Sequence, residues 1–176
     1  GYVAYETLEE VKKKFDLIKS LKISPKAITD LTQDENNIIF STFGMVMYLN
    51  KVTYEFVKSY STLEKVVLLK KKKKKKEKEE VKKGGRANPL ATELQQIHSI
   101  SLDGILLSVA LDDGTVKVWN TETDKPIALL KDHELQVLNV YNDGDYIVTS
   151  SAKGIINIRD FETKDLLNTI EGHQWD

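Results

Sequence analysis

Apolar and polar residues alternate in short runs along the second half of the chain. Val116 and Val118 flank Lys117, and residues 156–158 show the same alternation forty positions later. A period of two is typical of a β-strand with one buried face. The pattern therefore predicts short strands, with Val116, Val118 and the adjoining Trp119 in a core.

Glycine-containing turns separate these apolar runs. Glycine tolerates the positive φ that tight hairpins require, so each such dipeptide between two runs predicts a hairpin. The four dipeptides are Asp103-Gly104, Asp113-Gly114, Asp143-Gly144 and Lys153-Gly154. Together with further apolar runs at 127–130 and 166–170, they predict two units of four antiparallel strands.

The two units are copies of one another. Shifting the sequence by forty positions superimposes them without a gap, placing Asp103 on Asp143 and His133 on His173. A weaker copy lies seventy positions upstream, where Gly44 falls on Gly114. A period of about 40–45 residues with four short strands per unit is typical of β-propeller blades.

The repeat also predicts how the chain is divided. The expected segments are a partial blade at 1–23, a divergent blade at 24–66, a lysine-rich inserted loop at 67–95, blades at 96–132 and 133–173, and the start of another repeat at 174–176. The N-terminus has neither an initiator methionine nor a signal segment, so we expect the chain to be an excerpt of a longer protein.

Residues 112–120 resemble the most recognisable segment of a WD40 repeat, and Asp132-His133 and Gly172-His173 resemble the Gly-His pair that opens the next one. The resemblance covers residues 97–173 well and 24–60 more weakly. It implies an all-β fold of four-stranded propeller blades. Three units and a partial one form an incomplete ring, so the remaining blades must come from the same longer chain or from a partner chain.

The resemblance also implies a buried hydrogen-bond network of histidine, serine or threonine, aspartate and tryptophan within a blade. The structural repeat positions are Asp113, Gly114, Trp119, His133, Thr149, Gly154 and His173. No unit has the whole set: the second has Glu93 at the histidine position, and the third has Lys153 for the aspartate and Arg159 for the tryptophan. We therefore expect apolar packing to hold the blades together.

Charge is unevenly distributed over the 176 residues, although the net charge is only −1. Residues 70–86 carry ten lysines and one arginine against three glutamates, a net of +8, which leaves −9 for the remainder. The run itself is Lys70, Lys71, Lys72, Lys73, Lys74, Lys75 and Lys76. Its three interpretations are a disordered solvated loop, a nuclear-import signal, and a patch that binds RNA or a membrane surface.

Candidate chemistry is sparse. The three histidines fall at separate places in the repeat and form no ligand set, and neither a nucleophile elbow nor a glycine-rich phosphate loop occurs. We therefore predict no catalytic residue, metal or cofactor, and interpret Asp112-Asp113 as turn residues rather than an acid/base pair. The lack of cysteine suits an intracellular, cytoplasmic or nuclear location, and no apolar stretch is long enough to insert into a membrane.

The resemblance implies a non-enzymatic scaffold that gathers other proteins into an assembly. Loops at the ends of the strands would bind partners, and the candidate contacts are Asp132, Glu134, Lys153 and Arg159. One alternative is a ribonucleoprotein subunit, as in ribosome assembly, that touches RNA through its lysine tract. Another is a non-catalytic domain of a larger enzyme.

Overall fold

The computed structural model describes residues 26–63 and 94–172, which form twelve β-strands in three antiparallel sheets of four strands each. The first sheet comprises β1 (Asp30–Gln33), β2 (Asn37–Thr42), β3 (Met45–Asn50) and β4 (Phe56–Ser61). The second comprises β5 (Ile97–Asp103), β6 (Leu106–Leu111), β7 (Thr115–Asn120) and β8 (Lys125–Lys131). The third comprises β9 (Val137–Asn142), β10 (Tyr146–Ser151), β11 (Ile155–Asp160) and β12 (Leu166–Glu171).

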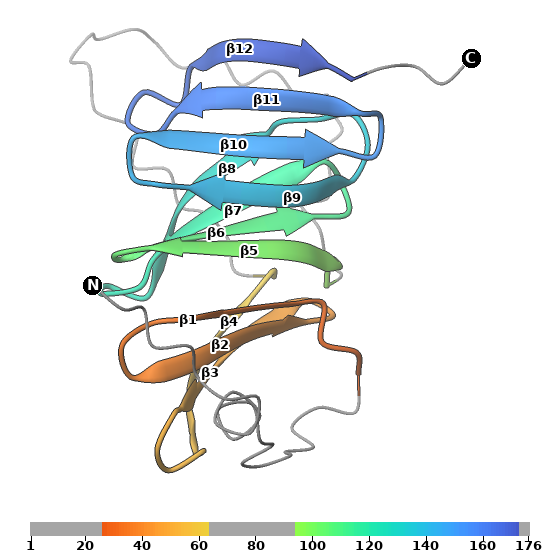
Figure 1. Ribbon diagram of the computed structural model, residues 1–176. Helices are drawn as coiled ribbons and strands as arrows, with labels where there is room; N and C mark the ends of the chain where they lie inside the picture. Colours follow the sequence, from red (N-terminus) through yellow and green to blue (C-terminus); the bar gives the residue numbers. More distant parts are fainter. Residues whose placement is uncertain (1–25, 64–93, 173–176) are drawn as a thin grey trace, which may run out of the picture.

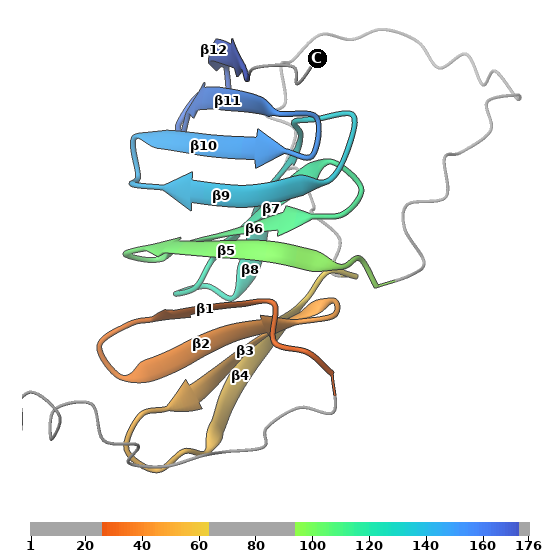
Figure 2. The same ribbon diagram turned by 45° about the vertical axis from the view of Figure 1, so that its right-hand side comes forward.

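The strands of each sheet follow one another in sequence order, as in an open meander. The second sheet lies between the other two (Figures 1 and 2), with its first strand β5 packed against β1 and β2, and with β9 packed against β5 and β6. The prediction of an all-β fold of successive four-stranded blades in an incomplete ring is confirmed for the described residues. The expected segments 1–23 and 174–176, and nearly all of 67–95, lie outside them.

The repeat is visible in the backbone itself. The hairpin glycines Gly44, Gly114 and Gly154 have φ angles of 77°, 83° and 75°. Each sheet also has one non-glycine residue with positive φ just before its last strand. These residues are Tyr54, Asp124 and Lys164, and they are separated by the same offsets of seventy and forty positions. The last two strands of each sheet shift register at equivalent places, after residues 48, 118 and 158. Each sheet is therefore one copy of the same unit.

The predicted strands agree closely with the observed ones. The last strand of the second unit, expected at 127–130, runs from Lys125 to Lys131, and that of the third, expected at 166–170, runs from Leu166 to Glu171. Three of the extra residues, Lys125, Lys131 and Glu171, are polar and pair at the strand ends, where an apolar pattern carries no signal; the fourth is Pro126.

Two apolar clusters join the sheets. Between the first and second sheets, Tyr48, Tyr60 and Trp119 form an aromatic group, with ring centroids 5.7 Å apart for the tyrosines and 5.8 Å apart for Tyr60 and Trp119. Between the second and third sheets the packing is aliphatic and includes Val116, Val140 and Ile147. Burying such side chains contributes roughly 1.5–3 kcal/mol each, which makes this packing the main attachment between blades.

Candidate partner-binding site at the third sheet

The segment between β8 and β9 brings Asp132, His133 and Glu134 to one end of the third sheet. The amides of Asp132 and His133 both donate to the carbonyl oxygen of Gly114, at 3.1 and 3.0 Å, which ties this segment to the β6–β7 hairpin. The approach requires glycine, because a Cβ at position 114 would lie 2.2 Å from the carbonyl oxygen of His133. Gly114 thus fixes the position of the segment that carries Asp132, His133 and Glu134.

Thr149, on β10, links His133 and Asp132 in a buried chain of hydrogen bonds. Its hydroxyl donates to the carboxylate of Asp132, and the Nε2 atom of His133 lies 2.8 Å from the same hydroxyl oxygen. Because the single hydroxyl proton goes to the carboxylate, Nε2 must carry a proton and donate to Thr149. Burial lowers the pKa of His133, and nearby Arg159 lowers it further, while Asp132 opposes both. At neutral pH the imidazole is therefore uncharged, with its proton on Nε2.

The side chain of Asp132 is fully buried, and two further residues hold Asp132, one at its carboxylate and one at its main chain. Arg159 on β11 donates from Nε to Asp132 Oδ1 at 2.5 Å and from Nη1 to the carbonyl oxygen of Lys164 at 3.0 Å. Asn157 donates to the Asp132 carbonyl oxygen at 2.8 Å and accepts from the hydroxyl of Thr169 at 2.9 Å. A buried charge that is paired and hydrogen-bonded in this way costs far less than an isolated one.

This network differs from the one expected from the sequence. The repeat register places the aspartate of the network in the hairpin after the second strand of the unit, where Lys153 stands, and therefore predicts an incomplete network in the third blade. In the structure Asp132, the residue before the histidine, provides the carboxylate, and Arg159 at the tryptophan position pairs with it. An acid beside the histidine together with a base at the tryptophan position is the sequence signal of this arrangement.

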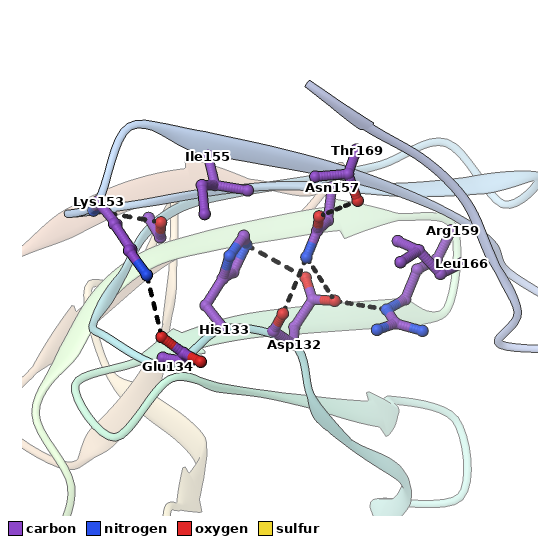
Figure 3. A pocket seen from close by; sticks show the side chains of 10 residues that line it. Asp132, His133, Glu134, Lys153, Ile155, Asn157, Arg159, Leu166 and Thr169 are labelled. Atoms are coloured by element: carbon purple, nitrogen blue, oxygen red, sulfur yellow. Dashed lines mark hydrogen bonds and ion pairs between the residues drawn. The ribbon is translucent and has the colours of Figure 1, made fainter. Parts of the chain in front are cut away.

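An open pocket of about 250 Å³ lies beside the network, on the face of the third sheet that is turned toward the second. Figure 3 shows its lining, which is Asp132, His133, Glu134, Ser151, Lys153, Ile155, Asn157, Arg159, Leu166 and Thr169. At its rim the ammonium group of Lys153 lies 3.1 Å from the carboxylate of Glu134. The side chains of this rim pair are 56% and 84% exposed, so a partner can reach both.

The four candidate contact residues thus line one pocket, but they are not equally accessible. Glu134 and Lys153 face solvent, whereas the side chain of Asp132 is completely buried and that of Arg159 is 17% exposed. Asp132 and the partly buried Arg159 hold the pocket in shape, and the two exposed residues form its rim.

The other residues singled out in the sequence lie elsewhere. Trp119 is buried between the first two sheets. Asp113 accepts hydrogen bonds from Thr115 within its own turn, and the neighbouring Asp112 pairs with His98 at 2.9 Å. Gly154 occupies the β10–β11 hairpin with a φ of 75°. His173 and the tract Lys70–Lys76 lie outside the described residues.

The described part of the chain shows neither a metal-binding cluster nor a membrane-spanning helix. No group of three histidine, cysteine or acidic side chains is placed there to hold a metal ion. Residues 26–63 and 94–172 likewise contain no helix of the length and apolar character needed to cross a bilayer.

Comparison with known proteins identifies the fold. No protein-family model matches the chain, and no curated protein matches it. Among solved structures, 88% of the chain superimposes on "U3-55K" and on the "RRP9 WD40 repeats", each with a TM-score of 0.64 and 12% identity, over 42% and 41% of those chains. It also superimposes on the computationally designed Ika8 protein, with a TM-score of 0.61 and 20% identity, over 40% of that chain.

The chain therefore spans about 40% of the length of these structures. At such low identities the similarity speaks to architecture, and it agrees with the three repeated four-stranded sheets. The chain has the fold of the WD40-repeat β-propellers, and three consecutive blades of it are described.

Proposed function

We propose that this chain is part of a β-propeller that serves as a non-enzymatic scaffold and binds other proteins at the rim of the pocket in its third blade. The observation that carries the proposal is the exposed Lys153–Glu134 pair standing at the mouth of an open pocket whose base is a buried hydrogen-bond network. Turns held on a rigid base are where propeller-like scaffolds present binding residues.

The base supports this role because it limits movement of the rim. Glu134 follows Asp132 and His133, whose amides and side chains are fixed by Gly114 and Thr149. Lys153 lies in the β10–β11 hairpin, where its amide is 3.3 Å from the hydroxyl of Ser151. Because the rim is already held in place, little of its conformational entropy is lost when a partner binds, and this favours affinity.

Charge reversal tests the proposal. The purified chain is immobilised, proteins are captured from an extract of its source cells, and captured proteins are identified by mass spectrometry. Lys153→Glu and Glu134→Lys should each reduce capture of the same proteins by at least tenfold. Lys125→Glu, at an exposed position on β8 outside the pocket, is the matched control and should change nothing. Equal capture by all three variants would rule out binding at this rim.

A ribonucleoprotein role is the second candidate, and the charge of residues 70–86 favours it. This tract carries +8 while the rest of the chain carries −9, so any contact with RNA phosphates would depend on the tract. Deleting residues 70–86 should then reduce the salt dependence of RNA binding, measured by fluorescence anisotropy between 50 and 200 mM salt, a range over which such contacts weaken by roughly a thousandfold or more. An unchanged slope would remove this candidate.

We further propose that additional blades, from a longer form of this chain or from a partner chain, complete the ring, and that the protein acts inside the cell. A role as a non-catalytic domain of a larger enzyme is compatible with the same scaffold. The length of the natural polypeptide distinguishes these arrangements, because it gives the number of blades and any catalytic domain.

A further inference from the structure

The pocket of the third sheet has a counterpart in the second sheet, where three of the equivalent positions carry larger side chains. The forty-residue offset relates Trp119 to Arg159, Lys117 to Asn157 and Leu111 to Ser151. In the second sheet these three side chains fill the space against the first sheet, and the residues are only 1%, 3% and 2% exposed.

The aromatic ring of Trp119 dominates the filled site. It lies 5.8 Å from the ring of Tyr60, and the ammonium group of Lys117 lies 4.9 Å from its centroid. At the equivalent place in the third sheet, Arg159 turns onto the buried carboxylate of Asp132, and Asn157 is shorter than lysine. The smaller side chains of the third sheet, and the turn of Arg159 toward Asp132, therefore leave a pocket of about 250 Å³. In the second sheet, Trp119 and its neighbours fill the equivalent space.

We propose that this pocket receives an aromatic side chain of a partner protein, a tryptophan or a tyrosine, in the place that Trp119 fills in the second sheet. The inference rests on the proposed scaffold function and names the chemistry that its site recognises.

The lining suits an aromatic ring. Ile155 and Leu166 provide aliphatic surface, and the guanidinium of Arg159, fixed by hydrogen bonds to Asp132 and to the carbonyl oxygen of Lys164, provides a planar cation. A guanidinium stacks on aromatic faces and attracts them electrostatically. The nearby amide of Asn157 and hydroxyl of Thr169 can bind an indole N–H or a phenol hydroxyl.

Size and charge argue against the other ligand classes. A volume of about 250 Å³ lies just below the roughly 300–1,000 Å³ of small-molecule sites, so it suits one large side chain. The lining carries two carboxylates, Asp132 and Glu134, and two cations, Lys153 and Arg159, and these are already paired with each other. A free phosphate or carboxylate would therefore gain little net attraction there.

The test uses N-acetyl-L-tryptophanamide as the probe and the whole chain, labelled with ¹⁵N. We expect saturable NMR shifts of the Asn157 side-chain amide and the Arg159 Nε–H, with affinity at least tenfold weaker for N-acetyl-L-leucinamide. Failure of the tryptophan probe to saturate these signals would overturn the proposal, as would tighter binding of inorganic phosphate at the same signals.

Two variants that fill the pocket sharpen the test. Arg159→Trp restores the residue of the second sheet, and Leu166→Trp fills the pocket from β12 while keeping the Asp132–Arg159 pair. Each should weaken probe binding at least tenfold, while Lys125→Ala leaves it unchanged. Thermal unfolding shows whether each variant is folded, and if Arg159→Trp is not, Leu166→Trp decides: undiminished binding overturns the proposal.

The Leu166→Trp variant also distinguishes failure of this inference from failure of the proposed function. If Leu166→Trp captures the same cellular proteins as the unchanged chain, while Lys153→Glu does not, the rim binds partners and the aromatic pocket is wrong. If the unchanged chain captures no protein at this rim, the scaffold proposal itself falls.

Discussion

Arg159 donates a hydrogen bond from Nε to Oδ1 of Asp132 over 2.5 Å, joining a strand residue to a linker residue 27 positions earlier in the chain. The side chain of Asp132 is wholly buried, and that of Arg159 is 17% exposed. In the third sheet, the ion pair of Arg159 with Asp132 thus stands where the second sheet has Trp119, and both residues of the pair line the pocket.

Breaking this pair should destabilise the third sheet. Asp132→Asn should lower the free energy of unfolding by about 3–5 kcal/mol, because it leaves Arg159 without its charge partner in a largely buried place. Urea denaturation measures the loss, and a double-mutant cycle with Arg159→Met isolates the part due to the pair. Glu122→Ala, at an exposed turn position, is the control. Additive losses in the cycle would show that the two residues are not coupled.

Acid should weaken the same sheet through His133. Its pKa in the folded chain is lowered, chiefly by burial, so the unfolded chain binds the extra proton more readily. The neutral imidazole therefore contributes its full stability above the unfolded pKa of about 6.5, and this stability is lost as the pH falls below that value.

The unfolding midpoint in urea, measured from pH 7.5 downward, reports this loss. His133→Gln keeps a donor for Thr149 and has no proton to take up, so its stability should fall less steeply. His98→Gln leaves His133 in place and should keep the loss of the unchanged chain. A pH profile that His133→Gln does not flatten would assign the acid sensitivity to other groups.

Alanine substitution should destabilise the chain to different extents at Gly114 and Gly154, which occupy equivalent positions of successive repeats. Gly154→Ala should cost roughly 1–2 kcal/mol, because its φ of 75° strains an L-residue while nothing lies within 4 Å of the added Cβ. Gly114→Ala carries the same strain and also meets the carbonyl oxygen of His133 at 2.2 Å, which adds roughly 1–3 kcal/mol of overpacking. Equal losses of unfolding free energy would contradict the close approach of the linker to the hairpin.

The sequence predicted the repeated part of the fold because each repeat carries its own local signals. Period-two alternation at Val116 and Val118, with glycine at 114 and 154, predicts a hairpin without any tertiary information. The forty-residue offset then also relates Asp124 to Lys164, two positive-φ residues; aspartate adopts this conformation more readily than most residues, whereas the lysine gives no hint of it.

The site was less predictable, because partners in a buried network need not occupy the usual positions. The repeat register places Lys153 at the aspartate position of the network, so the sequence predicts Asp132 as a partner contact but not as the carboxylate of the buried network. Burial of Asp132 depends on Gly114, Thr149 and Arg159 from three other elements. Only tertiary structure shows that these converge and that Glu134 and Lys153 stay exposed beside them.

Contacts between the first and second blades should keep the pKa of Asp124 below its ordinary value. Asp124, in the turn after β7, accepts hydrogen bonds from Lys58 at 2.8 Å and Tyr60 at 2.5 Å, and these bonds lower the pKa of its carboxyl group. Lys58→Met should raise that pKa toward its ordinary value, which an NMR titration of the Asp124 side chain measures. Lys125→Met, which removes a neighbouring exposed ammonium group that makes no such bond, is the comparison. An unchanged pKa in Lys58→Met would mean that the inter-blade bond is not formed in solution.

The two sides of a blade should respond differently to the same change in polarity. Val116 is fully buried between the second and third sheets, whereas Ile156, its counterpart forty residues later, is 37% exposed on the face of the third sheet that points away from the second. Val116→Thr should cost roughly 1–3 kcal/mol because it buries a hydroxyl, and Ile156→Thr should cost less than about 1 kcal/mol. Urea denaturation at several protein concentrations measures both. A large cost for Ile156→Thr that grows with protein concentration would show instead that another copy of the chain covers this face in solution.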